Sequence, residues 1–383
     1  MPPVLYLLAL CNLVIGTGAF VLNGILVQVS TALHVSVAAA GQSMSVYALT
    51  TATLAPLAMV LTGAWTRRRT LLVSMLVFAG GNLVCALATQ FPMLLVGRAL
   101  MGLGAMFTPV AAGIAVALVE PAQRGRALSL VFLGMSLSYV IGLPLGTWLG
   151  LRFGWQVPVL LVVAASLLSC VALWLLMPAR IAAPGASFKG LPHLLSNPPV
   201  LWTLLLTLLY FVAIFVVFSY IAPVLQTLNP MSSGGLSLTL MIFGLAGVAG
   251  TVLGGWAQDR YGAVRCLTLQ LIVLGGMMAL VPLTQGHHAL MVTVFVLWGI
   301  AGFGMMTPQQ ARLTALSPTQ APLLLSLNTS MLYFGTALGA AVGGAAMGAV
   351  GFANLAWVGV PFIVAGLFTL WINARKPALL ASA

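Results

Sequence analysis

Twelve long apolar segments, separated only by short hydrophilic gaps, constrain this chain more than any other feature. A helix that crosses a bilayer needs about 20 apolar residues, and only helices and closed barrels satisfy their backbone hydrogen bonds in lipid. Charged residues are 4% of the chain, against about 25% in soluble domains, so there is little room for a domain outside the membrane. We therefore expect an all-α membrane protein with twelve transmembrane helices. The segments fall at about 5–28, 38–62, 70–90, 93–118, 127–150, 157–177, 200–224, 236–257, 266–284, 289–311, 322–346 and 355–373.

The basic residues predict the orientation of the chain. Twelve spans place both termini on one side of the membrane, and positive charge favours the cytoplasmic side. All but two of the Lys and Arg residues lie in or beside the even-numbered gaps or at the C-terminus, so both termini are expected in the cytoplasm. The net charge of +12 follows from this pattern and does not indicate nucleic-acid binding. The residues are Arg67, Arg68, Arg69, Arg124, Arg126, Arg180, Lys189, Arg260, Arg265, Arg312, Arg375 and Lys376.

The longest hydrophilic stretch, 178–199, divides the spans six and six and contains the Pro, Gly and Ser residues of an irregular linker. We expect an N-terminal six-helix bundle at 1–177, a cytoplasmic central loop at 178–199 and a C-terminal six-helix bundle at 200–383. A row of small residues in span 5 recurs 197 positions later in span 11, which indicates a parallel duplication typical of transporters. The two rows are Gly134, Ser138, Gly142 and Gly146, and Met331, Gly335, Gly339 and Gly343.

Three short motifs carry a resemblance to a known family. The stretch Gly255-Trp-Ala-Gln-Asp259-Arg260-Tyr-Gly262 is similar to the G-x-x-x-D-R-x-G-R-K loop signature of the major facilitator superfamily. In the first half, Thr66 stands at the Asp position and Arg69 at the second Gly position. Span 4 resembles the R-x-x-x-G-x-G pattern of the family, and span 5 resembles the glycine–proline motif of its exporters. These segments read Arg98-Ala-Leu-Met-Gly102-Leu-Gly104 and Gly142-Leu-Pro144-Leu-Gly146.

The resemblance covers nearly the whole chain and is closest to the bacterial twelve-span drug:proton antiporter-like exporters. It implies two pseudo-symmetric six-helix bundles in the inner membrane that export small amphipathic organic solutes by alternating access. Drug-, sugar- and nucleoside-like substrates all remain open. The expected partners are the small-molecule substrate and the lipid bilayer, with protons as the candidate coupling ion, and with no nucleic acid, no cofactor and no metal. A monomer is expected.

In this family spans 1, 4, 7 and 10 line the substrate cavity, flanked by spans 2, 5, 8 and 11. A mostly apolar cavity with Met and aromatic side chains and few hydrogen-bonding groups suits amphipathic solutes of varied shape. The competing interpretation of each such residue is packing between helices. The candidate cavity residues are Asn12, Asn23, Tyr47, Arg98, Met101, Tyr210, Trp298, Met305, Asn328 and Tyr333.

A second group of residues is predicted to form the gates. We expect Glu120 to pair with one of Arg67–Arg69, and Asp259 to cap a helix or pair near Arg312. The glycine faces of spans 5 and 11 are expected to pack against the opposite half when the outside is closed. The gating and motif residues are Arg67, Gly102, Glu120, Arg124, Gly142, Pro144, Gly146, Asp259, Arg260 and Gly262.

Arg98 lies within span 4, where a charge costs about 2.5–3.5 kcal/mol even on insertion scales. It either donates hydrogen bonds to span 1 carbonyls and pins the two helices, or senses the substrate or the open and closed states. The exporters that this chain resembles commonly carry an acid in span 1, and Ala19 stands at that position. The only acids are Glu120 and Asp259, both in cytoplasmic gaps.

This lack of an embedded acid leaves three interpretations of energy coupling. The substrate carries its own proton, loop acids or outer histidines couple indirectly, or the protein is an uncoupled facilitator. A membrane enzyme is the rival from another class, but the sequence has no catalytic constellation, no metal-ligand cluster and no acid within a span. A receptor would normally carry a soluble output domain, for which there is no room.

Overall fold

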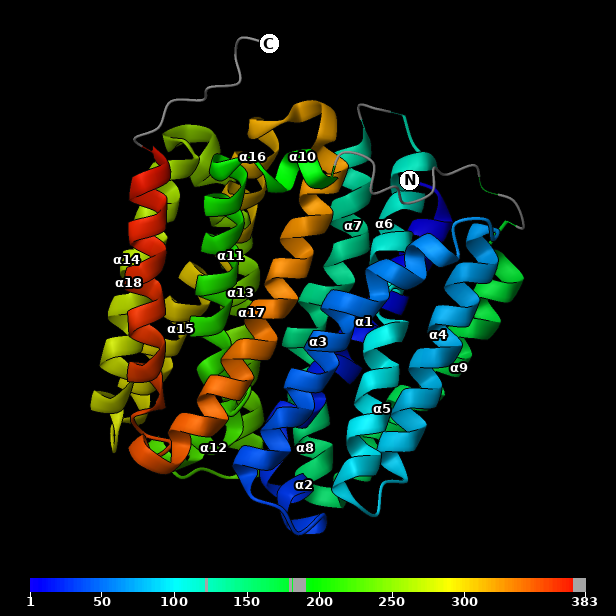
Figure 1. Cartoon of the computed structure of the whole chain (residues 1–383). Helices are drawn as coiled ribbons and strands as arrows, with labels where there is room; N and C mark the ends of the chain where they lie inside the picture. The colour runs from blue at the N-terminus through cyan, green and yellow to red at the C-terminus, as the bar shows by residue number, and fades with distance from the viewer. Residues whose placement is uncertain (121–122, 179–180, 182–190, 375–383) are drawn as a thin grey trace. The chain divides into compact units, whose positions relative to one another are not determined.

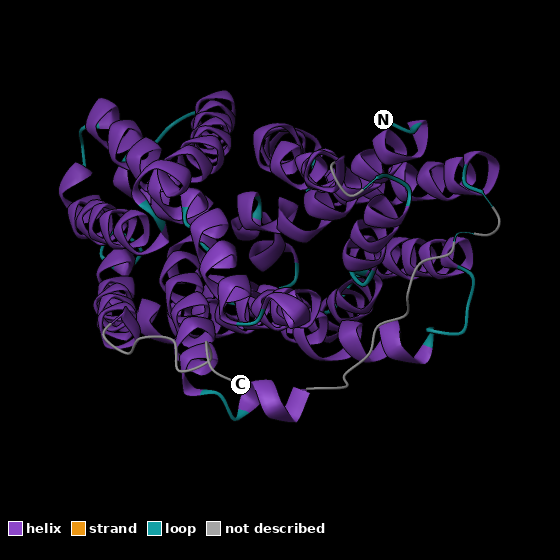
Figure 2. Cartoon of the chain, turned by 90° about the horizontal axis from the view of Figure 1, so that it is seen from above, coloured by secondary structure: helices purple, strands orange, loops and turns teal. Residues whose placement is uncertain are grey.

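The structure, a computed structural model, describes residues 1–120, 123–178, 181 and 191–374. Eleven helices within these residues are long and apolar enough to cross a membrane, and the 25-residue helix α3 (Val37–Leu61) occupies the second predicted segment. Figure 2 shows helices and loops but no strand in this part of the chain. All twelve predicted segments are therefore helical, which confirms the predicted fold class. Arg180, Lys189, Arg375, Lys376 and half of the central loop, residues 179–180 and 182–190, lie outside the described residues, so the predicted orientation stays a prediction.

By its contacts the chain divides into two compact units. Unit 1 comprises Met1–Ala186 and Met231–Met241, and unit 2 comprises Ser187–Pro230 and Ile242–Ala383. The first turns of α13 therefore group with unit 1. In unit 1, α1 packs against α7 and α9, and α5 packs against α3 and α4 (Figure 1). The helices of unit 1 are α1 (Pro3–Gly24), α2 (Leu26–Ala32), α3, α4 (Arg67–Ala86), α5 (Phe91–Gly104), α6 (Phe107–Ala117), α7 (Arg124–Leu137), the π-helix η2 (Ser138–Gly142), α8 (Leu143–Phe153) and α9 (Gln156–Leu176).

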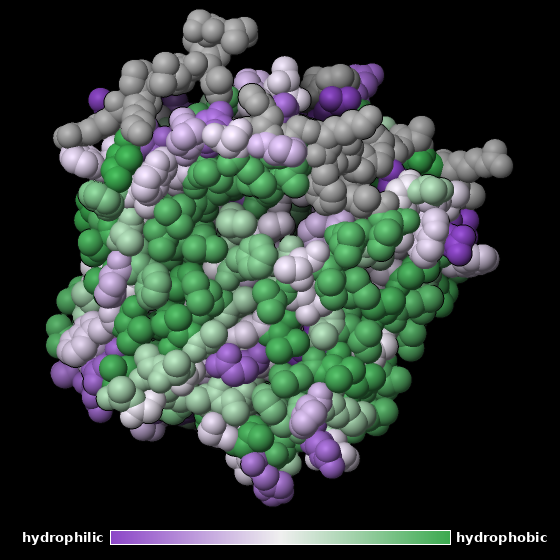
Figure 3. All heavy atoms as spheres, in the orientation of Figure 1, coloured by the Kyte–Doolittle hydropathy of each residue, from purple (hydrophilic) through white to green (hydrophobic). Residues whose placement is uncertain are grey.

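In unit 2, α11 packs against α17 and α18, and α14 packs against α15 and α18. Many large apolar side chains remain exposed on the spans of both units, and hydrophobic residues dominate the face seen in Figure 3. The helices are α10 (Leu191–Leu195), α11 (Pro198–Phe218), α12 (Ile221–Leu228), α13 (Ser233–Tyr261), α14 (Ala263–Leu280), η3 (Val281–Thr284), α15 (His288–Gly304), α16 (Met306–Leu316), η4 (Pro318–Gln320), α17 (Ala321–Val350) and α18 (Leu355–Ala374).

The breaks within spans repeat between the halves. Span 1 is divided into α1 and α2 and span 7 into α11 and α12, while span 4 is divided into α5 and α6 and span 10 into α15 and α16. The same interruptions at corresponding places support the internal repeat that the glycine rows predict. They also place irregular backbone within spans, which lipid tolerates only where protein or a cavity surrounds it.

The turn between spans 2 and 3 corrects the predicted pairing of the two loop motifs. Thr66 is the N-cap of α4, where its hydroxyl accepts a hydrogen bond from the Arg69 backbone N–H at 3.4 Å. Its counterpart at the start of α14 is Gly262, with a φ of +82°. Thr66 therefore corresponds to Gly262 and not to Asp259, which lies within α13. The positive φ explains why a glycine joins two helices that no other residue separates.

Candidate substrate and gating sites

Arg98 is fully buried on α5 and joins three helices of unit 1. Its Nε donates to the Ser43 carbonyl at 3.2 Å, Nη1 to the Gly18 carbonyl at 3.1 Å and Nη2 to the Ala19 carbonyl at 2.9 Å. Its guanidinium also lies 4.8 Å from the centroid of the Tyr47 ring. The structure therefore has the arrangement in which Arg98 pins neighbouring helices together. At Ala19, where the resemblance places an acid, the backbone carbonyl accepts the hydrogen bond from the guanidinium.

The two remaining N–H groups of Arg98 face sulfur. Nη1 lies 3.9 Å from the Met101 sulfur and Nη2 lies 3.4 Å from the Met44 sulfur. A guanidinium has five N–H donors. All five therefore have acceptors here, so Arg98 has no free donor for a solute in this conformation.

Gly102 allows α5 to approach α3 at backbone distance. A Cβ added at Gly102 would lie 2.6 Å from the Tyr47 carbonyl oxygen and 2.8 Å from Thr50 Cβ. The Thr51 hydroxyl donates to the Gly102 carbonyl at 3.3 Å. This small residue of the span 4 motif therefore fixes the contact that brings Tyr47 to Arg98.

Asn12 is fully buried and joins α1 to α6 and α7. Its Nδ2 donates to the Val131 carbonyl at 3.0 Å, and its Oδ1 accepts from the Thr108 hydroxyl at 2.8 Å. Both ends of the amide are thus used between helices. The packing interpretation describes Asn12 in this conformation, and a solute that bound it would have to replace one of these bonds.

A corresponding polar cluster lies in unit 2, centred on Thr207. The Thr207 hydroxyl donates to Asn328 Oδ1 at 2.6 Å and accepts from Gln309 Nε2 at 2.9 Å. Gln309 Nε2 also donates to the Thr203 carbonyl at 2.5 Å. Among the described residues, Gln309 Oε1 and Asn328 Nδ2 are buried without a hydrogen-bond partner. The two amides that bind the Thr207 hydroxyl therefore keep one free acceptor and one free donor, which match a neutral polar group such as a hydroxyl or an amide.

Gln309 is a residue that the sequence interpretation missed. It lies on α16, in the polar stretch Met306-Thr-Pro-Gln-Gln310, which resembles the end of a span. The internal repeat gives a signal for the other two side chains of its cluster, since Thr207 and Asn328 lie 195 and 197 positions after Asn12 and Val131. The repeat therefore predicts a second polar contact between spans 7 and 11.

An aromatic cluster stands in unit 2 where unit 1 has Arg98 and Tyr47. Phe295 lies 197 positions after Arg98, and Phe243 lies 196 positions after Tyr47. The rings of Phe243 and Phe295 meet edge-on, with centroids 6.2 Å apart. Trp298 completes the cluster, at 5.0 Å from Phe295 and 5.6 Å from Phe243. At corresponding positions, unit 1 therefore has an arginine over an aromatic ring, whereas unit 2 has a contact between two aromatic rings.

The other predicted cavity residues lie within their own units. Met101, Tyr210 and Met305 are buried, and the Tyr210 hydroxyl lies 3.8 Å from the Met306 sulfur. Asn23 is buried with its Nδ2 lacking a hydrogen-bond partner among the described residues. Tyr333 is half-buried on α17. Their role as cavity residues stays a prediction.

The small residues of span 5 form a seam with α1, which we call the glycine seam (Gly134, Gly142, Gly146 and Gly150). A Cβ on Gly142 would overlap the Thr17 side chain, and one on Gly146 would overlap Val21. In unit 2, a Cβ on Gly339 would lie 2.6 Å from the Val212 carbonyl oxygen of α11. In this structure a neighbour in the same unit fills these faces. Their packing against the opposite half when the outside is closed stays a prediction.

A change of helix type accompanies the glycine seam. The π-helix η2 ends at Gly142, and Pro144 opens the following helix α8. Proline has no backbone N–H and disturbs the preceding turn, and a π-turn absorbs such a disturbance. The carbonyl of Pro144 accepts a hydrogen bond from the Ser237 hydroxyl at 2.7 Å. The motif therefore combines close packing with a local change of helix geometry.

The predicted gate residues lie mainly at the surface of their units. Glu120, Arg124, Asp259 and Arg260 are exposed. Two of the arginines that are predicted to pair with Glu120 contact aromatic rings in this structure. Arg68 lies 4.6 Å from the Trp174 ring centroid and Arg69 lies 4.3 Å from that of Trp65.

The structure bears on one atom of the other predicted contact. Arg312 Nη1 is buried without a hydrogen-bond partner among the described residues, so this nitrogen does not bind Asp259. The gate pairings, which are expected in only one state of the cycle, stay a prediction.

Comparison with known proteins matches nearly the whole chain to membrane transporters of one family. The model of the family described as Major Facilitator Superfamily matches residues 8–320 and 231–382. The inner membrane transport protein YdhP of Escherichia coli (strain K12) is 32% identical over 369 residues, covering 94% of this chain and 93% of YdhP. The uncharacterized MFS-type transporter YbcL of Bacillus subtilis (strain 168) is 28% identical over 379 residues, covering 97% and 96%.

Solved structures share the fold. A bacterial homolog of the human lysosomal transporter Spinster, in an inward-facing and occupied conformation, matches with a TM-score of 0.83 at 18% identity, covering 97% of this chain and 96% of that one. A D-xylose–proton symporter matches with a TM-score of 0.78 at 15% identity, covering 96% of both chains. At these identities the likeness concerns the fold alone.

Proposed function

Because this chain belongs to the major facilitator superfamily, and is therefore a multi-pass membrane transporter of small solutes and not an enzyme, we propose that it exports small amphipathic organic solutes across the bacterial inner membrane. The bundles at 1–177 and 200–383 are the bodies that alternate access, and both termini lie in the cytoplasm. The protein acts as a monomer. Each of these points goes beyond family membership.

The observation that carries export is the glycine–proline segment of span 5. It resembles the motif of the family's exporters, and in the structure it has a physical role. Gly142 and Gly146 leave no room for a side chain between span 5 and span 1, so the two spans move together. The π-turn at Ser138–Gly142 lets this joined pair bend within the membrane.

The substrate class follows from the buried polar groups. The interior of unit 2 offers aromatic rings, Met side chains and neutral amides, with a free acceptor on Gln309 and a free donor on Asn328. In unit 1, the donors of Arg98 are already used. Apolar surface with a few neutral hydrogen bonds selects amphipathic solutes that carry hydroxyl or amide groups.

A facilitator is the second candidate, and one specific observation favours it. Neither acid of the chain lies inside a span, and Ala19 occupies the position where related exporters place one. A proton that crosses with this protein would therefore travel on the substrate or through groups in the loops. Without such a route the protein only equilibrates its solute.

Transport into inverted membrane vesicles tests both candidates. A panel of fluorescent amphipathic solutes is added to vesicles with the wild-type protein or with the Gly142→Leu variant. Export predicts accumulation above equilibrium in energised wild-type vesicles, and a facilitator predicts equilibration at the same rate with or without energy. Vesicles in which wild type and the variant behave alike for every solute would argue against both.

A further inference from the structure

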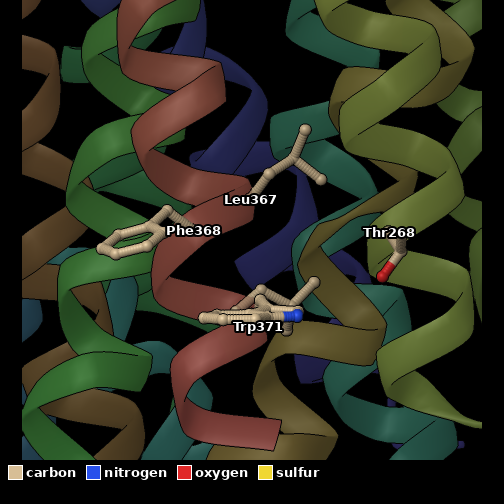
Figure 4. Close-up of a pocket in the computed structure, with 5 residues that line it drawn as sticks. Thr268, Leu367, Phe368 and Trp371 are labelled. Atoms are coloured by element: carbon tan, nitrogen blue, oxygen red, sulfur yellow. The ribbon is translucent and has the colours of Figure 1, made fainter.

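A groove of about 380 Å³ lies on the surface of unit 2 between α14 and α18 (Figure 4). Thr268 contributes from α14, and Leu367, Phe368, Leu370 and Trp371 contribute from α18. Phe368 and Trp371 are 58% and 50% exposed, and their rings stack with centroids 6.0 Å apart. In a membrane protein such a groove is filled from the membrane.

The lining of the groove determines which part of a molecule fills it. Thr268 is the only polar side chain among the five, apart from the indole of Trp371. Its hydroxyl donates to the Val264 carbonyl of its own helix at 2.8 Å. The Thr268 hydroxyl proton therefore already has an acceptor within the protein. The portion of the occupant between the helices is apolar and slender, as an acyl chain is.

The position of the groove along its helices determines what lies next to it. Trp371 lies one turn before the end of α18 at Ala374, and Arg265 lies in the first turn of α14. Arg265 and Thr268 are three residues apart and so share a face of α14. Arg265 is exposed. Tryptophan favours the level of the lipid headgroups, so this end of the groove lies beside the headgroup region.

The two helices that form the groove supply no carboxylate for the charge at this end. Neither α14 nor α18 contains an acidic residue, and Arg265 is the only charged residue within the two described helices. A lipid phosphate would supply the missing negative charge. A second copy of this face would bring a second Arg265 to the contact, because a twofold interface pairs identical patches. Charge therefore favours a lipid over a second protein chain.

We infer that the groove between α14 and α18 is a binding site for an anionic phospholipid. One acyl chain lies between Thr268, Leu367 and Trp371, and the headgroup contacts Arg265. The inference rests on membership of a membrane transporter family and not on the direction of transport, so it stands or fails separately from the proposed export.

Quenching of tryptophan fluorescence by brominated lipids tests the headgroup. The purified full chain is reconstituted in phosphatidylcholine. In one series phosphatidylglycerol with brominated chains replaces it stepwise, and in a parallel series phosphatidylcholine with the same brominated chains does. The difference between wild type and Trp371→Phe isolates the signal of Trp371. One basic residue near an anionic surface predicts a preference of about five-fold for the anionic lipid. Arg265→Gln removes that preference. Arg126→Gln, at an exposed arginine of unit 1, retains it.

A second variant tests the acyl chain. Thr268→Phe fills the groove and is expected to lower quenching of Trp371 by either brominated lipid, with an unchanged unfolding midpoint as evidence of folding. Equal quenching by the two lipids in wild type, or unchanged quenching in Thr268→Phe, overturns the inference. Absence of quenching together with a disulfide-linked dimer of Leu367→Cys would assign the groove to a second copy.

Discussion

Arg98 donates a hydrogen bond of 2.9 Å to the backbone carbonyl of Ala19. The exporters that this chain resembles commonly have a carboxylate at the position of Ala19, whereas here the main chain supplies the acceptor. Because the methyl side chain of Ala19 cannot titrate, the arginine is held by neutral groups alone. The contact therefore joins α1 to α5, and no titration at position 19 makes it depend on pH.

The first prediction is that lysine cannot replace Arg98. An ammonium group donates from a single nitrogen and cannot reach the carbonyls of Gly18, Ala19 and Ser43 together. Each buried carbonyl left without a donor costs about 1–3 kcal/mol. We expect Arg98→Lys and Arg98→Met both to lower the thermal unfolding midpoint of the purified protein by several degrees.

The matched control for Arg98 is Arg152→Gln, which alters an exposed arginine in the last turn of α8 and should leave the midpoint unchanged. A wild-type midpoint and wild-type transport in Arg98→Lys would contradict the pinning role. Normal stability with lost transport would instead assign Arg98 to the substrate.

The second prediction concerns one contact of the glycine seam. A methyl group on Gly142 overlaps Thr17, and overpacking of this kind typically costs about 1–3 kcal/mol. Gly142→Ala should therefore lower stability and transport, and Thr17→Ala in the same chain should restore most of both. Unfolding midpoints of the two single variants and the double variant measure the coupling between the sites.

Gly348→Ala is the control for this cycle, because a Cβ at Gly348 would contact nothing within 4 Å. If Gly142→Ala behaves like Gly348→Ala, the close approach of span 5 to α1 has no energetic importance. If adding Thr17→Ala to Gly142→Ala restores neither stability nor transport, the methyl group at position 142 collides with a residue other than Thr17.

The seam and the Arg98 contacts show how far the sequence reaches. Small residues at every fourth position identify a face of span 5 without large side chains. An arginine inside a span predicts hydrogen bonds to carbonyls of neighbouring helices. The sequence does not say which helix covers the face of small residues, and in this structure α1 covers it at Gly142. Gln309 escaped notice because its value depends on Thr207, a hydroxyl on another helix. The pairing of Thr66 with Asp259 failed because the first half has a longer turn between its helices.

The third prediction concerns the hydroxyl at the centre of the polar cluster in unit 2. Thr207→Val keeps the shape but leaves Gln309 and Asn328 each without the bond to this hydroxyl, at a cost of about 1–3 kcal/mol. Thr207→Ser should retain most of the stability. Thr227→Val is the control, because the Thr227 hydroxyl bonds only the Pro223 carbonyl of its own helix.

Transport separates two roles of this cluster. If Gln309 and Asn328 bind the solute, Gln309→Leu raises the KM of hydroxyl- or amide-bearing solutes more than that of purely apolar ones. An equal change for every solute would mean that the cluster only holds α11, α16 and α17 together. A wild-type unfolding midpoint in Thr207→Val would show that even this structural role is negligible.

The last prediction is that no carboxylate in the membrane couples transport to protons. Glu120 and Asp259 are the only acids, both are exposed, and Arg98 does not release its proton near neutral pH. Flux of a permanently charged or neutral solute into inverted vesicles should therefore depend only weakly on an imposed pH gradient. A weak base of similar shape, which carries its own proton, serves as the comparison and should respond to the gradient.

A strong, stoichiometric response of the non-titrating solute would contradict this prediction and require a proton site elsewhere. Glu120→Gln and Asp259→Asn then decide between the two remaining carboxylates, because an amide keeps the shape and removes the titration. If the response survives both substitutions, the proton moves through a group other than a carboxylate. If one substitution abolishes it, coupling operates through that exposed carboxylate and needs no acid buried inside the bundle.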